Sequence, residues 1–224
     1  MQRTFFITGT DTGAGKTVLA TLLTRFLRER GIKVATFKPV CSGGRDDARK
    51  IHTALDETLT LDEINPWHFR AAIAPALAAK IEKTSITLAQ VLAHIRSKRS
   101  NLELTLVEGA GGLLSPLGKD FDSRDLILAL RATPIIVAPN QLGVVNHLLL
   151  TLEALPKNYR AKSKVVLMSP AKPDSATTTN AGLLGDFFPS NQIFTLPWLG
   201  TTPKAKAAAL KKSEVRRMLA ALAT

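Results

Sequence analysis

A Gly-rich stretch near the N-terminus carries the residues best suited to chemistry. It runs from Gly9 to Thr17 in the pattern Gly-x5-Gly-Lys-Thr. Glycines at this spacing let backbone N–H groups approach a phosphate, and Lys16 would reach the outer phosphate oxygens. The Thr17 hydroxyl is a suitable ligand for Mg²⁺. The usual phosphate loop has four residues between its glycines, so this loop is one residue longer.

Four further charged residues stand at positions that suit the same chemistry. Lys38 ends an apolar run, and Asp46 and Asp47 open a helical pattern. Acidic residues in a first helical turn often serve the helix dipole, but either aspartate could also help to hold a metal. Glu108 follows another apolar run and precedes a glycine. An acidic residue at such a strand end is where phosphate-loop proteins place a carboxylate for Mg²⁺.

The elements that must position these residues alternate along the chain. An apolar run at 5–7 predicts a strand, the amphipathic pattern at 18–30 a helix, and 33–37 a second strand. Because strands and helices keep alternating, we expect an α/β fold with one mostly parallel, doubly wound sheet flanked by helices. Further strands are expected at 102–107, 134–138, 165–168 and 193–196, with helices at 46–55, 74–83, 87–99, 122–130, 143–155, 177–188 and 204–222.

Length and composition indicate one cytoplasmic domain over residues 1–224. The chain has no run of 18 apolar residues, and Met1-Gln2-Arg3 leads into the first strand without a cleavable hydrophobic segment. We therefore expect no membrane association. Cys41 is the single cysteine, which excludes an internal disulfide and a cysteine-based metal cluster.

The charge is strongly positive, with 30 basic and 18 acidic residues giving a net charge of +12. Residues 156–224 hold 11 of the basic residues and only 3 of the acidic ones. Such an excess can indicate nucleic acid or another anionic ligand. Because the basic residues are spread among apolar ones, we favour a solvated face and do not expect nucleic acid.

Four motifs occur in order along the chain: the loop at 9–17, Lys38-Pro39-Val40-x-Ser42-Gly43, residues 108–112 (Glu-Gly-Ala-Gly-Gly) and Leu142-Gly143-x-x-Asn146-His147. Together they resemble the dethiobiotin synthetase family, in which the longer phosphate loop is usual. It implies a P-loop NTPase-like fold and a homodimer with a shared substrate site. It also implies that 7,8-diaminopelargonate, CO₂ or bicarbonate and ATP react with Mg²⁺ to give dethiobiotin, ADP and phosphate.

The resemblance also assigns roles to residues. Lys16 and Lys38, expected on adjacent strand ends, would be catalytic and bracket the transferred phosphoryl and the carbamate. Thr17, Asp47 and Glu108 would be the metal ligands. The implied nucleotide site comprises Gly13, Ala14, Gly15, Lys16, Thr17, Val18, Asp47, Glu108, Gly109, Ala110, Gly111, Ser169, Pro197, Trp198 and Leu199. The implied substrate site comprises Thr12, Lys38, Ser42, Pro75, Gly111, Leu142, Gly143, Val144 and Asn146, the last four serving the other subunit.

The sequence departs from the family pattern at the nucleotide base. Met168-Ser169-Pro170 stands where Ala-Asn-Asp is expected, and the asparagine is the family's adenine-reading residue. A second departure concerns the turn before Leu142-Gly143, where the family usually has Lys or Arg and this chain has Gln141. The first departure concerns the base. The preferred base therefore stays open at this point.

Three other interpretations compete with a synthetase. A DNA-partitioning switch ATPase would use the basic C-terminal third on DNA, but positions 10–14 lack its lysine. An amide synthetase of cobalamin synthesis would need a further domain for which this chain has no room. A nucleotide-binding domain without catalysis is disfavoured because Lys16, Thr17, Lys38 and Glu108 are all present.

Overall fold

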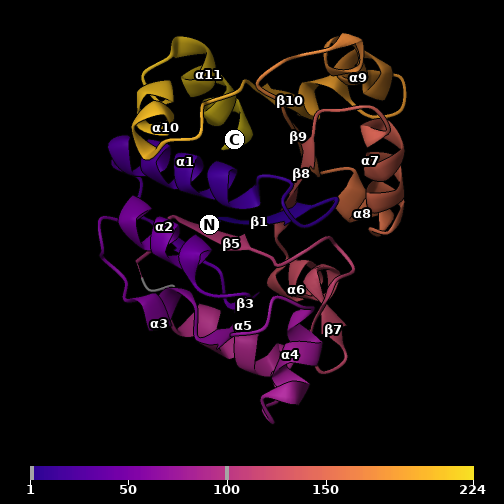
Figure 1. Cartoon of the computed structure of the whole chain (residues 1–224). Coiled ribbons are helices and arrows are strands. Elements are labelled where there is room, and N and C mark those ends of the chain that lie inside the picture. The colour runs from indigo at the N-terminus through magenta and orange to yellow at the C-terminus, as the bar shows by residue number, and fades with distance from the viewer. Residues whose placement is uncertain (1–2, 99–100) are drawn as a thin grey trace.

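A parallel sheet forms the centre of the protein in the computed structural model, which describes residues 3–98 and 101–224. Within these residues six strands pair in the order β10-β9-β8-β1-β5-β2 (Figure 1). All five pairings are parallel. The strands are β1 (Arg3–Gly9), β2 (Val34–Phe37), β5 (Leu104–Glu108), β8 (Thr133–Pro139), β9 (Lys164–Met168) and β10 (Ile193–Leu196). The expected doubly wound parallel sheet is confirmed.

Helices cover both faces of this sheet (Figure 1). They are α1 (Lys16–Glu29), α2 (Asp46–Ala54), α3 (Leu61–Ile64), α4 (Pro75–Ile81), α5 (Leu88–Ser97), α6 (Ser123–Leu130), α7 (Val144–Glu153), α8 (Lys157–Arg160), α9 (Ser175–Gly185), α10 (Pro203–Ala209) and α11 (Ser213–Leu222). Two small sheets pair β3 (Val40–Ser42) with β4 (Trp67–Phe69) and β6 (Pro116–Gly118) with β7 (Phe121–Asp122). The short elements α3, α8, β3, β6 and β7 carry too few residues for a periodic pattern, and the sequence did not predict them.

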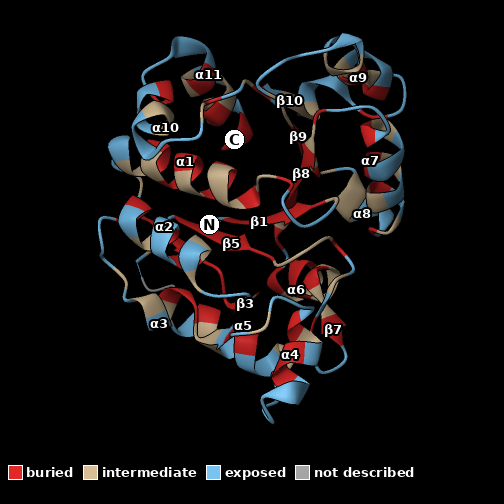
Figure 2. Ribbon diagram, in the orientation of Figure 1, coloured by how far each residue is buried: buried red, intermediate tan, exposed pale blue. Residues whose placement is uncertain are grey.

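The strand pattern divides the core into two layers. Successive side chains of a strand point to opposite faces of a sheet. Phe5 and Ile7 of β1 belong to the core layer that contains residues of α1, α10 and α11, whereas Phe6 belongs to the layer that contains residues of α4, α5, α6, α7 and α9. Figure 2 shows the resulting buried sheet between helices whose outer faces are exposed. The two layers hold the carboxyl ends of the strands in fixed positions.

The order of the strands corrects one expectation about the site. Lys16 follows β1 and Lys38 follows β2, but these strands are not adjacent, because β5 pairs with both. The register sets Ile7 of β1 opposite Glu108, the last residue of β5. The prediction of adjacent strand ends was wrong, and the carboxylate of β5 therefore lies between the two lysines.

The predicted single helix at 204–222 is also wrong. The structure has α10 and α11, with the chain turning between them at 210–212. Leu210 is buried, and Lys212 has extended backbone (φ −73°, ψ 128°). This turn lets Leu210 and the buried stripe of α11, which includes Val215 and Leu219, reach the same core layer. Tertiary packing thus overrides the helix propensity of this Ala-rich segment.

Other predicted elements agree with the structure within a few residues. The expected helix at 122–130 corresponds to α6, with Asp122 as its N-cap. The predicted end of the helix at Arg99 lies outside the described residues, as do Met1 and Gln2. In the part of the chain that the structure describes, no helix combines the length and apolarity needed to cross a membrane.

Candidate functional site

The phosphate loop connects the end of β1 to the first residue of α1. Gly13 and Gly15 have φ of +75° and +99°, a region that L side chains rarely adopt. The N-terminus of α1 supplies free backbone N–H groups and the positive end of the helix dipole. The loop and helix therefore form an anion site of the kind that binds phosphates.

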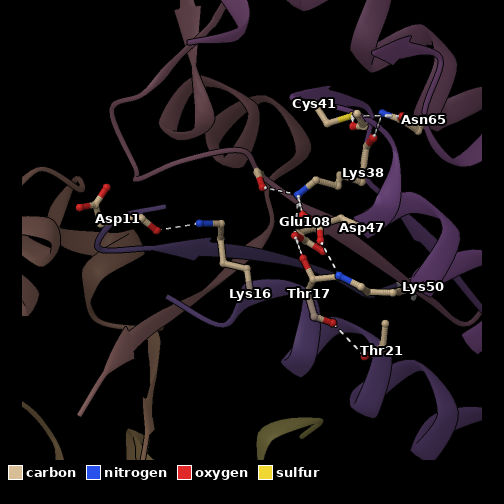
Figure 3. A network of polar contacts seen from close by, with 12 residues as sticks. Asp11, Lys16, Thr17, Thr21, Lys38, Cys41, Asp47, Lys50, Asn65 and Glu108 are labelled. Atoms are coloured by element: carbon tan, nitrogen blue, oxygen red, sulfur yellow. Dashed lines mark hydrogen bonds and ion pairs between the residues drawn. The ribbon is translucent and has the colours of Figure 1, made fainter. Parts of the chain in front are cut away.

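Lys16 is folded back onto this loop. Its Nζ donates a hydrogen bond to the Asp11 carbonyl at 2.8 Å, and only 6% of the residue is exposed (Figure 3). Burial, together with the positive charge of Lys38, lowers the pKa of Lys16 to about 8. The lysine is thus a buried cation without a carboxylate contact in the described residues, and a bound phosphate would supply the missing negative charge.

A buried carboxylate organises the other half of the site. Glu108 is 1% exposed, and its Oε1 accepts hydrogen bonds from Thr17 Oγ1 and Lys38 Nζ, both at 2.6 Å. Lys38 Nζ also lies 3.3 Å from Asp47 Oδ2 (Figure 3). Glu108 Oε2 is buried and has no hydrogen-bond partner among the described residues. Residues from α1, α2, β5 and the segment directly after β2 therefore meet in this cluster.

The charges in this cluster stabilise one another. Burial by itself would lower the pKa of Lys38, but the negative charges of Glu108 and Asp47 outweigh burial and raise it. Burial would likewise raise the pKa of Asp47, yet the nearby ammonium groups of Lys38 and Lys50 hold it below its usual value. At neutral pH Lys38 is positive and Asp47 is negative.

The donor set fits a hard divalent cation. Thr17, Asp47 and Glu108 offer a hydroxyl and two carboxylates, and the unpartnered Glu108 Oε2 has free lone pairs for a further contact. Residues 3–98 and 101–224 hold no group of three or more His, Cys, Asp and Glu placed to bind a metal. Mg²⁺ commonly uses one or two carboxylates and takes its other ligands from phosphates and water. Asp46 instead pairs with Arg49 at the surface, which leaves Asp47 as the aspartate of the cluster.

A cleft of about 700 Å³ opens over these groups. Most residues expected in the phosphate, metal and diamine sites line it: Thr12, Gly13, Gly15, Lys16, Thr17, Val18, Lys38, Ser42, Asp47, Pro75, Glu108, Ala110 and Gly111.

The cleft also has a wall that the sequence did not predict. This wall includes Cys41, residues 72–74 and Ser115. Ser42 Oγ donates to the Ile73 carbonyl at 2.6 Å, which joins the last residue of β3 to that segment. Ser115 Oγ accepts from the Gly112 backbone N–H at 2.8 Å. Proximity to the glycine run could have suggested Ser115, but no local pattern marks residues 72–74.

The expected base-side residues lie outside this cleft. Ser169 follows β9, and residues 197–199 follow β10, on the other side of β1 from Glu108. Met168 contacts the phosphate loop, because a Cβ added to Gly15 would lie 2.9 Å from Met168 Cε. Trp198 is 48% exposed, whereas Leu199 is buried. Ala14 and Gly109 also do not line the cleft, and Gly109 packs so closely that an added Cβ would be 2.7 Å from Ser123 Oγ.

The residues expected to serve a second subunit also lie apart from the cleft lining. Leu142 is 85% exposed and Asn146 is exposed, on the first turn of α7 and the loop before it. Gly143 is the N-cap of α7 with φ +88°. The Val144 side chain is buried in the core, so only its backbone could meet a ligand.

Comparisons with known proteins identify the family of the chain. A family model described as an AAA domain matches residues 3–212. A protein of Akkermansia muciniphila named ATP-dependent dethiobiotin synthetase BioD is 37% identical over 188 residues, covering 83% of this chain and 88% of that protein. A Bacillus subtilis (strain 168) protein of the same name is 33% identical over 209 residues, covering 91% and 88%. The chain belongs to the dethiobiotin synthetase family. A further similar member, from Methanococcus vannielii, is 40% identical over 152 residues, covering 68% of this chain and 72% of that protein.

Solved structures show that the dethiobiotin synthetase fold of this chain is shared more widely. The structure of pNOB8 ParA bound to nonspecific DNA superposes with a TM-score of 0.60 at 13% identity, covering 100% of this chain and 98% of that one. A ParA family ATPase from Chlorobium tepidum gives 0.58 at 13% identity, with both chains covered completely. At this identity the likeness concerns the fold alone.

Proposed function

We propose that this protein is an ATP-dependent dethiobiotin synthetase that closes the ring of 7,8-diaminopelargonate. One amine of the diamine takes up CO₂, forming an N–C bond and losing a proton to give a carbamate. The γ-phosphoryl group of ATP passes to a carbamate oxygen, and ADP leaves. The second amine attacks the carbonyl carbon and loses a proton, and inorganic phosphate leaves with the former carbamate oxygen, which gives the cyclic urea.

The observation that carries this proposal is the arrangement of two buried lysines on either side of Glu108 in one cleft. Lys16 belongs to the phosphate loop, while Lys38 lies beyond β5 on the side of Ser42 and Pro75. Phosphoryl transfer needs positioning and charge neutralisation more than covalent help. We assign Lys16 to the outer phosphates of the nucleotide and Lys38 to the carbamate that receives the phosphoryl group.

Thr17, Asp47 and Glu108 would hold Mg²⁺ beside the phosphates. When bound, the ion neutralises charge on the phosphate oxygens of the nucleotide. The protein supplies a hydroxyl and two carboxylates from α1, α2 and β5, which fixes the cation next to the phosphate loop.

The active protein is a homodimer in this proposal. Leu142, Gly143 and Asn146 lie at the exposed start of α7, where free N–H groups suit the far carboxylate of the diamine. Apolar side chains are exposed nearby on the same helix and on α9: Leu150 is 63% exposed and Leu183 is 50% exposed. A second copy covering these residues would bring its α7 N-terminus to the substrate.

The direct test is phosphate release with 7,8-diaminopelargonate, bicarbonate and Mg²⁺, with ATP, CTP and GTP in parallel. We expect release that requires the diamine, with dethiobiotin as the product detected by mass spectrometry. Comparing the three nucleotides measures the base preference of a chain that has Met168-Ser169-Pro170 in place of the adenine-reading asparagine. Phosphate release that ignores the diamine with every nucleotide would refute the proposal.

A variant tests the role of Lys38. Lys38→Ala should abolish ring closure but leave nucleotide binding largely intact, because Lys38 lies on the substrate side and not in the phosphate loop. Lys211→Ala, which removes an exposed charge on the turn after α10, is the matched control. Turnover by Lys38→Ala near the parent rate would refute its assigned role.

A further inference from the structure

Lys38 neutralises the two carboxylates that the proposed function assigns to a metal ion. Its side chain is 5% exposed, and its Nζ contacts Glu108 Oε1 at 2.6 Å and Asp47 Oδ2 at 3.3 Å. Thr17 Oγ1 donates to the same Glu108 oxygen at 2.6 Å. The ammonium therefore holds the carboxylates that the proposed function assigns to Mg²⁺.

The burial of Glu108 makes its contact with the Lys38 ammonium strong. Its side chain is fully buried, and an isolated buried carboxylate is costly unless a cation compensates it. A divalent cation on the same oxygens would face the Lys38 ammonium within a desolvated site, where like charges repel strongly. The ammonium and a metal ion cannot both keep close contact with Glu108 Oε1 and Asp47 Oδ2, the two oxygens that Lys38 contacts.

We infer that Lys38 is a placeholder cation that exchanges with the metal. In the metal-free cleft it neutralises Glu108 and Asp47, and metal binding displaces its ammonium from both. The Gly109 carbonyl, 3.4 Å from Nζ, remains as an acceptor while the displaced ammonium turns toward the cleft that Lys38 already lines. Lys38 thus becomes available to the carbamate only when the metal is bound. This inference rests on the metal site of the proposed function.

The exchange predicts that removing the ammonium strengthens metal binding. Mn²⁺ serves as the probe, with free Mn²⁺ measured by electron paramagnetic resonance in the nucleotide-free protein. We expect Lys38→Met to bind Mn²⁺ about tenfold more tightly than the parent, because the carboxylates no longer have a competing cation. Lys50→Met is the charge-matched control, since Lys50 Nζ lies 3.4 Å from Asp47 Oδ1 but is 61% exposed. It should change Mn²⁺ affinity less than about threefold, as expected for a solvent-screened pair.

The outcomes separate this inference from the proposed function. Equal tightening by both substitutions, or no tightening by Lys38→Met while the parent binds Mn²⁺, would overturn the exchange alone. Failure of parent and variant to bind Mn²⁺ without nucleotide would overturn the exchange alone, because the metal site of the proposed function takes further ligands from the nucleotide phosphates. If Lys38→Met does not fold in metal-free buffer, rescue of folding by Mn²⁺ but not by NaCl of equal ionic strength supports the exchange, and lack of rescue overturns it.

Discussion

Replacing Lys16 by methionine should stabilise the nucleotide-free protein at pH 7. Lys16 is charged in a buried site, where its pKa falls from 10.5 to about 8. At ~1.4 kcal/mol per pH unit this fall amounts to about 3 kcal/mol of unfavourable free energy. Loss of the hydrogen bond to the Asp11 carbonyl offsets about 1 kcal/mol of the gain. The net increase in unfolding free energy is about 2 kcal/mol, or roughly 4–8 °C in Tm for a chain of this size.

The pH dependence of the stability difference between Lys16→Met and the parent shows whether the buried Lys16 ammonium causes it. Below about pH 8 Lys16 is protonated in both the folded and unfolded states, so the whole penalty is present. Between about 8 and 10.5 the folded protein loses this proton while the unfolded chain keeps it, so the parent gains stability as the pH rises. The difference between variant and parent should therefore shrink over that interval.

Urea unfolding of parent and Lys16→Met, without nucleotide and with a chelator, measures the effect at pH 7 and pH 10. Lys211→Met controls for the loss of one positive charge, because Lys211 is exposed on the surface. We expect added ATP to stabilise the parent but not Lys16→Met. A variant less stable than the parent at pH 7, or a difference that does not change with pH, would refute the reasoning.

Three further predictions concern stability and the phosphate loop. Lys164→Met should lower the free energy of unfolding by about 1 kcal/mol in urea titrations, since the ammonium caps the last carbonyls of α11 at 3.0 and 3.2 Å. The hydrogen bond from Lys98 lowers the pKa of Glu63 to about 2, so this carboxylate stabilises the fold above pH 4.5 and its contribution disappears as the pH falls toward 2. In Glu63→Gln the free energy of unfolding should depend less on pH in that interval. An unchanged pH dependence between pH 4.5 and 2 would contradict this role of Glu63. Gly15→Ala should weaken ATP binding at least tenfold, as measured by calorimetry. The reason is that φ of residue 15 is +99° and the new Cβ would lie 2.9 Å from Met168 Cε. An affinity equal to that of the parent would show that the loop tolerates a side chain.

The phosphate loop was predictable because its determinants are consecutive in the chain. A short apolar strand, a glycine turn and an amphipathic helix are each set by neighbouring residues, so Lys16 and Thr17 could be placed at a helix N-terminus. The position of Glu108 at the end of a buried strand followed from the same kind of local pattern. The alternation of strands and helices likewise determined the parallel α/β class.

Tertiary structure decided which of these elements are neighbours. Strand order depends on long-range pairing and on packing of the two core layers, and no local pattern encodes it. The pairing of β5 between β1 and β2 set Glu108 between Lys16 and Lys38, where adjacent strand ends had been expected. The burial of Leu210 similarly divided the predicted C-terminal helix.

By itself the sequence determined the residue types that could bind a phosphate, hold a cation and contact an anionic substrate. Only the folded chain decided that Thr17 and Lys38 share one oxygen of Glu108, and that Asp47 instead of Asp46 joins them. The physical reason is that hydrogen bonds and ion pairs depend on distances of a few ångströms between residues up to 91 positions apart. Those distances follow from the packing of the whole sheet and its helices.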